Sequence, residues 1–98
     1  MRIAEVIGTV TLSRCHPALA GFRWVIGVPF SLTALRAGKP DSEELVIFDN
    51  LGAGHGSRIG FSEGGDAAVP FLPEKKPVDA YCACILDHLA IRFEGEVA

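Results

Sequence analysis

The sequence predicts an all-β protein, a small five-stranded Greek-key barrel of the OB type with one short helical turn. Turn signals recur often along the chain and the apolar runs between them are short, which favours strands over helices. With 98 residues the chain has room for one hydrophobic core, so we treat residues 1–98 as a single domain. Closing five strands into a barrel would remove most exposed strand edges.

The first two strands are expected at residues 2–12 and 22–30. The first segment is rich in Ile, Val and Thr, and alternation places Val6, Val10 and Leu12 on one face. Pro17 and Gly21 then interrupt the pattern. The second segment alternates strictly, and its large residues share one face, which we expect to form core: Phe22, Trp24, Ile26, Val28 and Phe30.

The middle of the chain predicts two further strands. Residues 31–44 turn polar, so we expect a solvated loop there. The segment "ELVIFDN", residues 44–50, predicts the third strand, and "SRIGF", residues 57–61, predicts the fourth. A glycine-rich loop separates these two strands.

The last third of the chain contains the fifth strand. Residues 62–77 hold two glycines and three prolines, which predicts irregular structure beyond one short helical turn near Asp66 to Val69. Residues 78–93 fit either a strand or a helix by length. Because alternation pairs Cys82, Cys84 and Leu86 on one face, we favour a strand through about Asp87.

Composition excludes some partners and locations. The net charge is −3 and the basic residues are scattered, with only Lys75 and Lys76 adjacent, so we expect no nucleic acid partner. A secretory signal is not expected, since Glu5 interrupts the start, and no stretch approaches the roughly 18 apolar residues of a membrane span. Three cysteines in such a chain are expected as reduced thiols. We expect the protein in the cytoplasm and without a membrane partner.

The apolar content points to association between copies. Hydrophobic residues are 49% of the chain, and 11 glycines bring the total to about 60%, against roughly 45–50% in an ordinary domain. A domain of this size buries only about 60–65% of its unfolded surface. The surplus therefore predicts burial between subunits of a homo-oligomer.

The glycine-rich segment "NLGAGHGSRIG", residues 50–60, could suggest a phosphate-binding loop. The Walker pattern needs a lysine that is absent here, and the third glycine of the dinucleotide pattern is replaced by Ser57. The residues that follow alternate like a strand, which leaves no helix N-terminus to receive a phosphate. We expect Gly52, Gly54 and Gly56 to allow positive φ or close approach of another backbone, and we expect no cofactor.

Metal binding and catalysis are weaker interpretations. Cys82, Cys84 and His88 could share a strand face, but alternate residues stand about 6.6 Å apart, too far for two sulfurs each about 2.3 Å from one zinc. We expect both cysteines to be small buried hydrophobes. No local signature supports pairing Cys15 with His88 or His55, and three carboxylates stand singly near strand ends: Asp49, Asp79 and Asp87. We expect no enzyme.

Three segments together resemble one family. "MRIAEVIGTVTLSRCHPALAG", "DNLGAGHGSRIGFSEG" and "PVDAYCACILD" are similar, in order and spacing, to the bacterial microcompartment vertex proteins of the EutN/CcmL type. The resemblance covers nearly all of the chain. It implies an OB-like barrel that forms a cyclic homopentamer at the five-fold vertices of a shell built mainly from hexameric shell proteins.

The resemblance also assigns a role to the glycine loop. It implies that the loop lies near the ring axis or a subunit boundary, where neighbouring backbones approach closely. The residues concerned are Asn50, Gly52, Ala53, Gly54, His55, Gly56 and Ser57. Two rival functions stay open at this point: a free-standing OB-type module for single-stranded nucleic acid, which needs a basic groove and exposed aromatic residues, and a small metal-binding protein using Cys82, Cys84 and His88.

Overall fold

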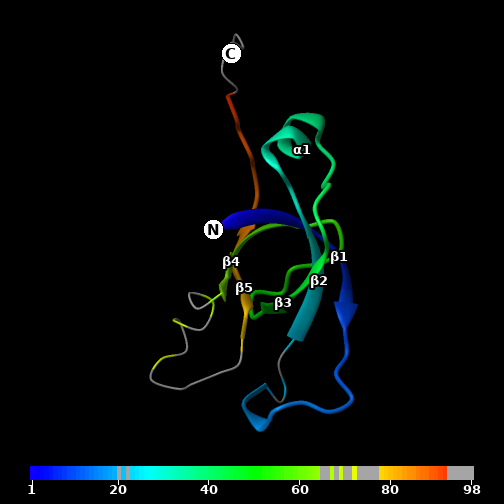
Figure 1. Cartoon of the computed structure of the whole chain (residues 1–98), viewed down its shortest axis with the longest axis vertical. Coiled ribbons are helices and arrows are strands. Elements are labelled where there is room, and N and C mark those ends of the chain that lie inside the picture. Colours follow the sequence, from blue (N-terminus) through cyan, green and yellow to red (C-terminus); the bar gives the residue numbers. More distant parts are fainter. Residues whose placement is uncertain are drawn as a thin grey trace.

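The computed structural model describes residues 1–19, 21, 23–64, 67, 69, 72 and 78–92. Five strands form a closed barrel in the order β1-β2-β3-β5-β4 (Figure 1). Their bounds are β1 Arg2–Val10, β2 Arg23–Pro29, β3 Leu45–Asp49, β4 Arg58–Glu63 and β5 Ala80–Leu86. The predicted all-β, five-stranded barrel is confirmed, and the last apolar segment is a strand.

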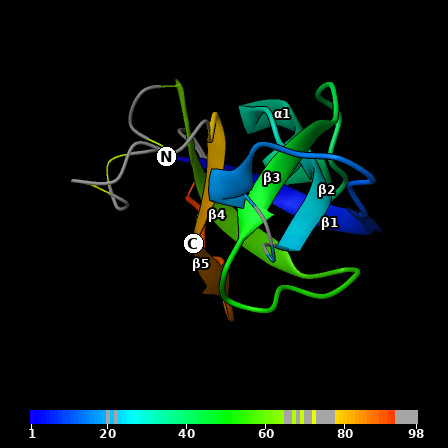
Figure 2. The same ribbon diagram turned by 90° about the horizontal axis from the view of Figure 1, so that it is seen from below.

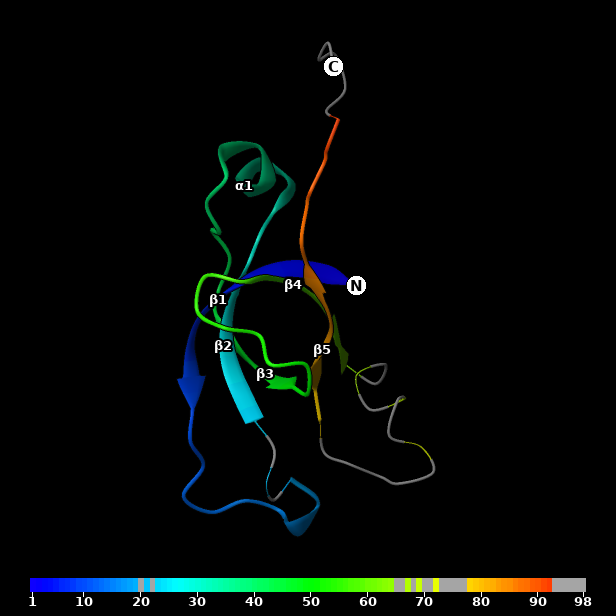
Figure 3. The same cartoon turned by 180° about the vertical axis from the view of Figure 1, so that it is seen from behind.

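Two short helical elements lie at opposite ends of the barrel. The helix α1 (Leu32–Ala37) lies at one end, and the 3-10 turn η1 (Pro17–Leu19) lies at the other (Figures 1 and 3). Seen from below, η1 lies in front of the barrel end where β2 begins (Figure 2). No helix in the described ranges is long and apolar enough to cross a membrane.

Strand pairing is antiparallel except at one seam. β1 pairs with β2 and with β4, and β4 pairs with β5, all antiparallel. β3 and β5 run parallel and meet at Phe48 and Tyr81. In β1 the register with β2 shifts between Val6 and Gly8, so Ile7 is the extra residue of a bulge. A bulge bends the strand and changes which face the following residues occupy.

The barrel interior is filled mainly by aliphatic side chains, and Phe61 is its largest member. Its members are Ala4, Val6, Val25, Ile47, Ala53, Ile59, Phe61, Ala80 and Cys82. The interior is tight beside Gly27, where an added Cβ would lie 2.6 Å from Cδ1 of Ile47 and 3.4 Å from the Cβ of Ala4. A side chain at Gly27 would therefore require Ile47 to shift.

The expected core face of the second strand is only partly correct: Trp24 and Phe30 are buried, Ile26 and Val28 are half-buried, and Phe22 lies outside the described residues. Val25 faces the barrel interior, whereas Trp24 belongs to a separate outer cluster with Phe48, Ala67 and Val78. β2 turns Val25 inward, whereas Trp24 packs edge-on against Phe48 in the outer cluster. Both faces of the strand start are thus covered, which alternation of large residues alone could not show.

The predicted face of the first strand is also only partly correct. Val6 faces the interior, but Val10 packs against the outer cluster and Leu12 is 39% exposed beyond the end of β1. The bulge at Ile7 explains the change, because residues after an extra residue switch faces.

The predicted solvated loop at residues 31–44 contains a helix, which corrects that prediction. The Ser31 side chain caps α1 by accepting a hydrogen bond from the Ala34 N–H at 3.1 Å, and Gly38 ends the helix with φ +79°. Asp41 supports the cap: it accepts hydrogen bonds from the N–H and the hydroxyl of Ser31. Serine before the helix and glycine after it are capping signals, but the polar composition concealed them. The helical turn expected near Asp66 to Val69 lies partly outside the described residues, which include only Ala67 and Val69 of it.

Candidate functional site

The loop after β3 is built around Asp49. This carboxylate is 2% exposed. It accepts hydrogen bonds from the N–H of Leu51 at 2.9 Å and the N–H of Ala53 at 2.8 Å, and it forms an ion pair with Arg23 at the start of β2. An Asp side chain that accepts from the backbone two residues on forms an Asx turn. Asp49 therefore holds the first half of the loop in one conformation.

The second half of the loop is fastened to β1. The Gly56 N–H donates to the Val6 carbonyl at 2.7 Å, and the Val6 N–H donates to the Ser57 carbonyl at 2.9 Å. Ser57 also closes the turn internally: its N–H donates to the Gly54 carbonyl at 3.0 Å, and its hydroxyl accepts from the Gly54 N–H at 3.2 Å. Both ends of the loop are thus tied to the barrel.

The glycines of this loop differ in backbone conformation, and only two of them have a positive φ. Gly52 and Gly56 have φ values of +86° and +85°, a region that L side chains rarely adopt. The expectation of positive φ is confirmed at these two positions. Gly54 is not in that region, and the nearest atom in its own chain to an added Cβ would be the Ser57 hydroxyl oxygen at 4.0 Å. Within one subunit, Gly54 has room for a side chain.

The loop residues named from the sequence fall into two groups. Five are exposed: Asn50, Gly52, Gly54, His55 and Gly56. Ala53 is fully buried in the barrel core of its own chain, and Ser57 is half-buried. Sequence reasoning missed Leu51, which is 48% exposed at the tip of the turn. The sequence signal was that Leu51 stands between Asn50 and Gly52, two residues typical of turns, and turn residues lie at the surface.

Nothing in this loop resembles a phosphate cradle. The residue after Ser57 begins β4, so the loop leads into a strand rather than into a helix N-terminus. The strand predicted after the loop is confirmed. The loop can hold a defined shape at the end of a barrel, and its exposed tip can contact another chain.

The cysteines are distributed over different parts of the molecule. Cys82 lies in the barrel core and its thiol points toward the Cys84 carbonyl, with the sulfur 3.7 Å from that oxygen. Burial raises the pKa of the Cys82 thiol to about 12, and the charge of Asp49 acts in the same direction. Cys82 is a buried hydrophobe, as predicted, whereas Cys84 is half-buried rather than buried.

The other residues proposed for metal or catalytic chemistry are scattered. His88 is exposed beyond the end of β5 and lines a different pocket from Cys15. Within the described ranges, no three His, Cys, Asp or Glu side chains are grouped so that they could hold a metal ion. Of the three single carboxylates, Asp49 has a structural role in its loop, and Asp79 and Asp87 are exposed.

The outer surface of the barrel carries an apolar strip across three strands. Ile26 of β2 lies opposite Gly8 of β1 and opposite Val46 of β3. Val46 is 47% exposed and Ile7, the bulge residue beside Gly8, is 43% exposed. We call Ile7, Ile26 and Val46 the outer strip. Three neighbouring β-branched residues on a strand surface form a flat apolar area suited to contact with another chain.

Comparisons with known proteins agree on one family. The family model described as ethanolamine utilisation protein EutN/carboxysome matches residues 1–87. The carboxysome shell vertex protein CcmL of Gloeobacter violaceus is 36% identical over 93 residues, covering 93% of this chain and 87% of that protein.

The solved structures show the same fold. The structure of Gloeobacter violaceus CcmL has a TM-score of 0.81 at 32% identity and covers 93% of this chain and 90% of that one. GrpN, a pentameric microcompartment shell protein from Rhodospirillum rubrum, has a TM-score of 0.79 at 25% identity, with 94% of this chain and all of that chain covered.

Proposed function

Because the chain belongs to the EutN/CcmL family, we propose that it is a structural shell protein whose homopentamers cap the five-fold vertices of a bacterial microcompartment. One observation carries this proposal: a carboxysome shell vertex protein shares 36% of its residues over 93% of this chain, and its solved structure has the same barrel. The role is structural and involves no catalysis. The whole chain, residues 1–98, acts as one vertex domain.

The surfaces of the barrel support a ring. The outer strip of Ile7, Ile26 and Val46 leaves apolar side chains partly exposed on one subunit, and burial against a neighbouring copy would remove them from water. The loop at residues 50–57 lies near the ring axis or at the boundary between subunits. Its rigid backbone suits a position where two chains approach closely.

The partners of the ring are hexameric shell proteins. Six-fold units alone form a flat or singly curved sheet, and a ring of five supplies the points at which such a sheet closes. The assembly is in the cytoplasm, within the shell, and requires neither membrane nor nucleic acid. The net charge of −3 argues against a nucleic acid partner. The burial of Trp24, Phe48 and Phe61 argues the same way, because base stacking needs exposed aromatic side chains.

Native mass spectrometry of the purified chain tests the ring. We expect a homopentamer at micromolar concentration. A monomer at that concentration would contradict both the ring and the vertex role. A different closed ring would keep the interface argument and contradict the vertex role.

The Gly54→Val variant tests the position of the loop. Gly54 has no positive φ and has room within its own chain, so the variant barrel should fold with a wild-type circular dichroism spectrum. A neighbouring chain close to this position would collide with the valine, and the pentamer should be lost. Gly52→Ala is the matched control, since its positive φ should lower the stability of the subunit itself. A normal pentamer with Gly54→Val would place Gly54 away from the contact between subunits.

A further inference from the structure

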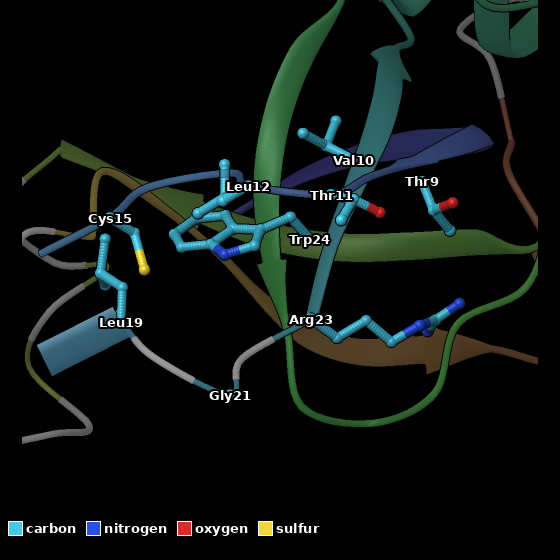
Figure 4. Close-up of a pocket in the computed structure, with 9 residues that line it drawn as sticks. All are labelled: Thr9, Val10, Thr11, Leu12, Cys15, Leu19, Gly21, Arg23 and Trp24. Carbon is cyan, nitrogen blue, oxygen red and sulfur yellow. The ribbon is translucent and has the colours of Figure 1, made fainter. Parts of the chain in front are cut away.

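A pocket of about 410 Å³ opens between the end of β1, η1 and the start of β2 (Figure 4). Its volume lies within the range of roughly 300–1,000 Å³ that is typical of small-molecule sites. The lining is mixed: Thr9, Thr11 and Arg23 are polar, whereas Leu12, Leu19 and Trp24 are apolar. Neither the loop at residues 50–57 nor the outer strip lines this pocket.

Strand register places the polar groups of the pocket on one face. Thr9 of β1 lies opposite Val25 of β2, and Val25 faces the barrel interior. Residues two apart in a strand share a face, so Arg23 lies on the face of Val25, and Thr11 continues the face of Thr9 just beyond β1. In Figure 4 both hydroxyls and the guanidinium lie on the same side of the pocket. The two threonines are exposed and the Arg23 side chain is 40% exposed, so a ligand can reach all three groups.

The ion pair with Asp49 leaves Arg23 with further donors. A guanidinium carries five N–H donors in a planar fork, and Asp49 engages Nη1. The Asp49 side chain is fully buried, is not part of the pocket lining, and also accepts from the N–H groups of Leu51 and Ala53. Its negative charge is therefore shared among three donors behind the guanidinium. An acceptor that enters the pocket meets Arg23 and not the carboxylate.

The other side of the pocket is apolar. Figure 4 shows Leu12, Leu19 and Trp24 together, on the side away from the Arg23 guanidinium. Leu12 is 39% exposed, so a ligand that covers it removes apolar surface from water. Trp24 is 9% exposed and serves as a wall. The ligand that matches both sides has an oxyanion group at one end and a short apolar body at the other.

We propose that this pocket binds small organic acids. A carboxylate or phosphate group accepts hydrogen bonds from Arg23 and from the hydroxyls of Thr9 and Thr11, while a short aliphatic body packs against Leu12 and Leu19. Hydrogen bonds from a guanidinium to an oxyanion are charge-assisted, which favours an acid over a neutral molecule of the same shape. The site lies within one subunit, so it does not depend on the proposed ring.

Isothermal titration calorimetry of the purified protein in its native oligomeric state tests the ligand. Isovaleramide has nearly the shape of isovalerate without its charge, and acetate has the charge without the apolar body. We expect isovalerate to bind about tenfold or more tightly than either. Isobutyl phosphate, measured beside isovalerate, shows which oxyanion the pocket prefers. Equal affinities for isovalerate and isovaleramide would overturn the proposal, as would no binding of either acid at millimolar concentration.

Variants of the lining test the polar groups. Arg23→Gln removes the fork and should abolish binding of isovalerate, but it also takes the partner from Asp49. The double variant Thr9→Val with Thr11→Val leaves that ion pair intact and should weaken binding about three- to tenfold. Arg14→Gln is the matched control, since Arg14 is exposed and does not line the pocket. Unchanged affinity in the double threonine variant, or an equal loss in Arg14→Gln and Arg23→Gln, would overturn the site.

Discussion

Asp49 connects parts of the chain that are distant in sequence. One buried carboxylate pairs with Arg23 on β2 and accepts hydrogen bonds from Leu51 and Ala53 in the loop. Its negative charge is compensated by one guanidinium and two N–H groups, which is the condition for burying an ion. The exposed tip of the loop therefore depends on a residue that the solvent does not reach.

Replacing Asp49 should show this dependence. Asp49→Ala leaves two backbone N–H groups without an acceptor and Arg23 without its partner, and it should lower the free energy of unfolding by about 2–4 kcal/mol. Asp49→Asn keeps one acceptor oxygen and should cost about half as much. Urea unfolding at one fixed protomer concentration measures both. Equal losses for the two variants would contradict the role of the hydrogen bonds.

Cys82 should behave as a packing residue. Cys82→Ala removes a buried sulfur and should lower the free energy of unfolding by about 1–2 kcal/mol, with the oligomer intact. Cys15→Ser, at an exposed position, should change it by less than about 0.5 kcal/mol. Urea unfolding with and without a chelator measures these effects. Loss of folding on adding the chelator, or zinc that survives dialysis, would contradict the packing role.

The helix α1 shows how local capping acts at the scale of one element. Ser31 begins the helix and Gly38 ends it. Asp41 then folds back to accept two hydrogen bonds from Ser31. These bonds from the Ser31 hydroxyl and N–H hold the pKa of the Asp41 carboxyl below its ordinary value of 3.8. Six residues that would be marginal as an isolated helix are fixed by contacts at both ends.

The cap should therefore depend on pH. A depressed pKa means that the ionised form of Asp41 stabilises the folded state; this contribution is present above pH 3.8 and is lost as the pH falls through the lower folded value. Ser31→Ala should raise the pKa of Asp41 toward 3.8, as measured by NMR titration. Thr33→Ala, on the exposed side of α1, is the control and should leave that pKa unchanged. If the pKa of Asp41 is the same in Ser31→Ala, the cap is not its cause.

At the scale of the whole molecule, the closed barrel leaves few ways to associate. Its strands are paired around the circle, so contacts between copies rely on side chains and loops rather than on long open edges. The outer strip and the loop tip supply apolar surface for such contacts. A cyclic arrangement uses each patch once per subunit and closes without free ends.

Shell assembly is the corresponding prediction. Co-expressed with the hexameric shell proteins of its own microcompartment, this chain should yield closed polyhedral particles in electron micrographs. Without it, the particles should have open vertices, since six-fold units supply no five-fold points. Sealed, unchanged particles after deletion of this chain would contradict the vertex role.

Local patterns determined much of this protein. Short apolar runs separated by turn signals predicted five strands and a barrel, and the glycine spacing at residues 50–57 predicted a shaped loop rather than a phosphate site. These features depend on neighbours in sequence. For that reason, the strand positions needed little correction.

Only the tertiary structure decided which side chains face inward and which surfaces remain for other chains. One extra residue at Ile7 turned Val10 outward. Val25 faces the barrel interior, while its neighbour Trp24 packs in the outer cluster against Phe48. Asp49 positioned Leu51 through contacts with a strand some 26 residues away. Register, interior volume and long-range hydrogen bonds are set by the assembled barrel, so no local pattern could reveal them.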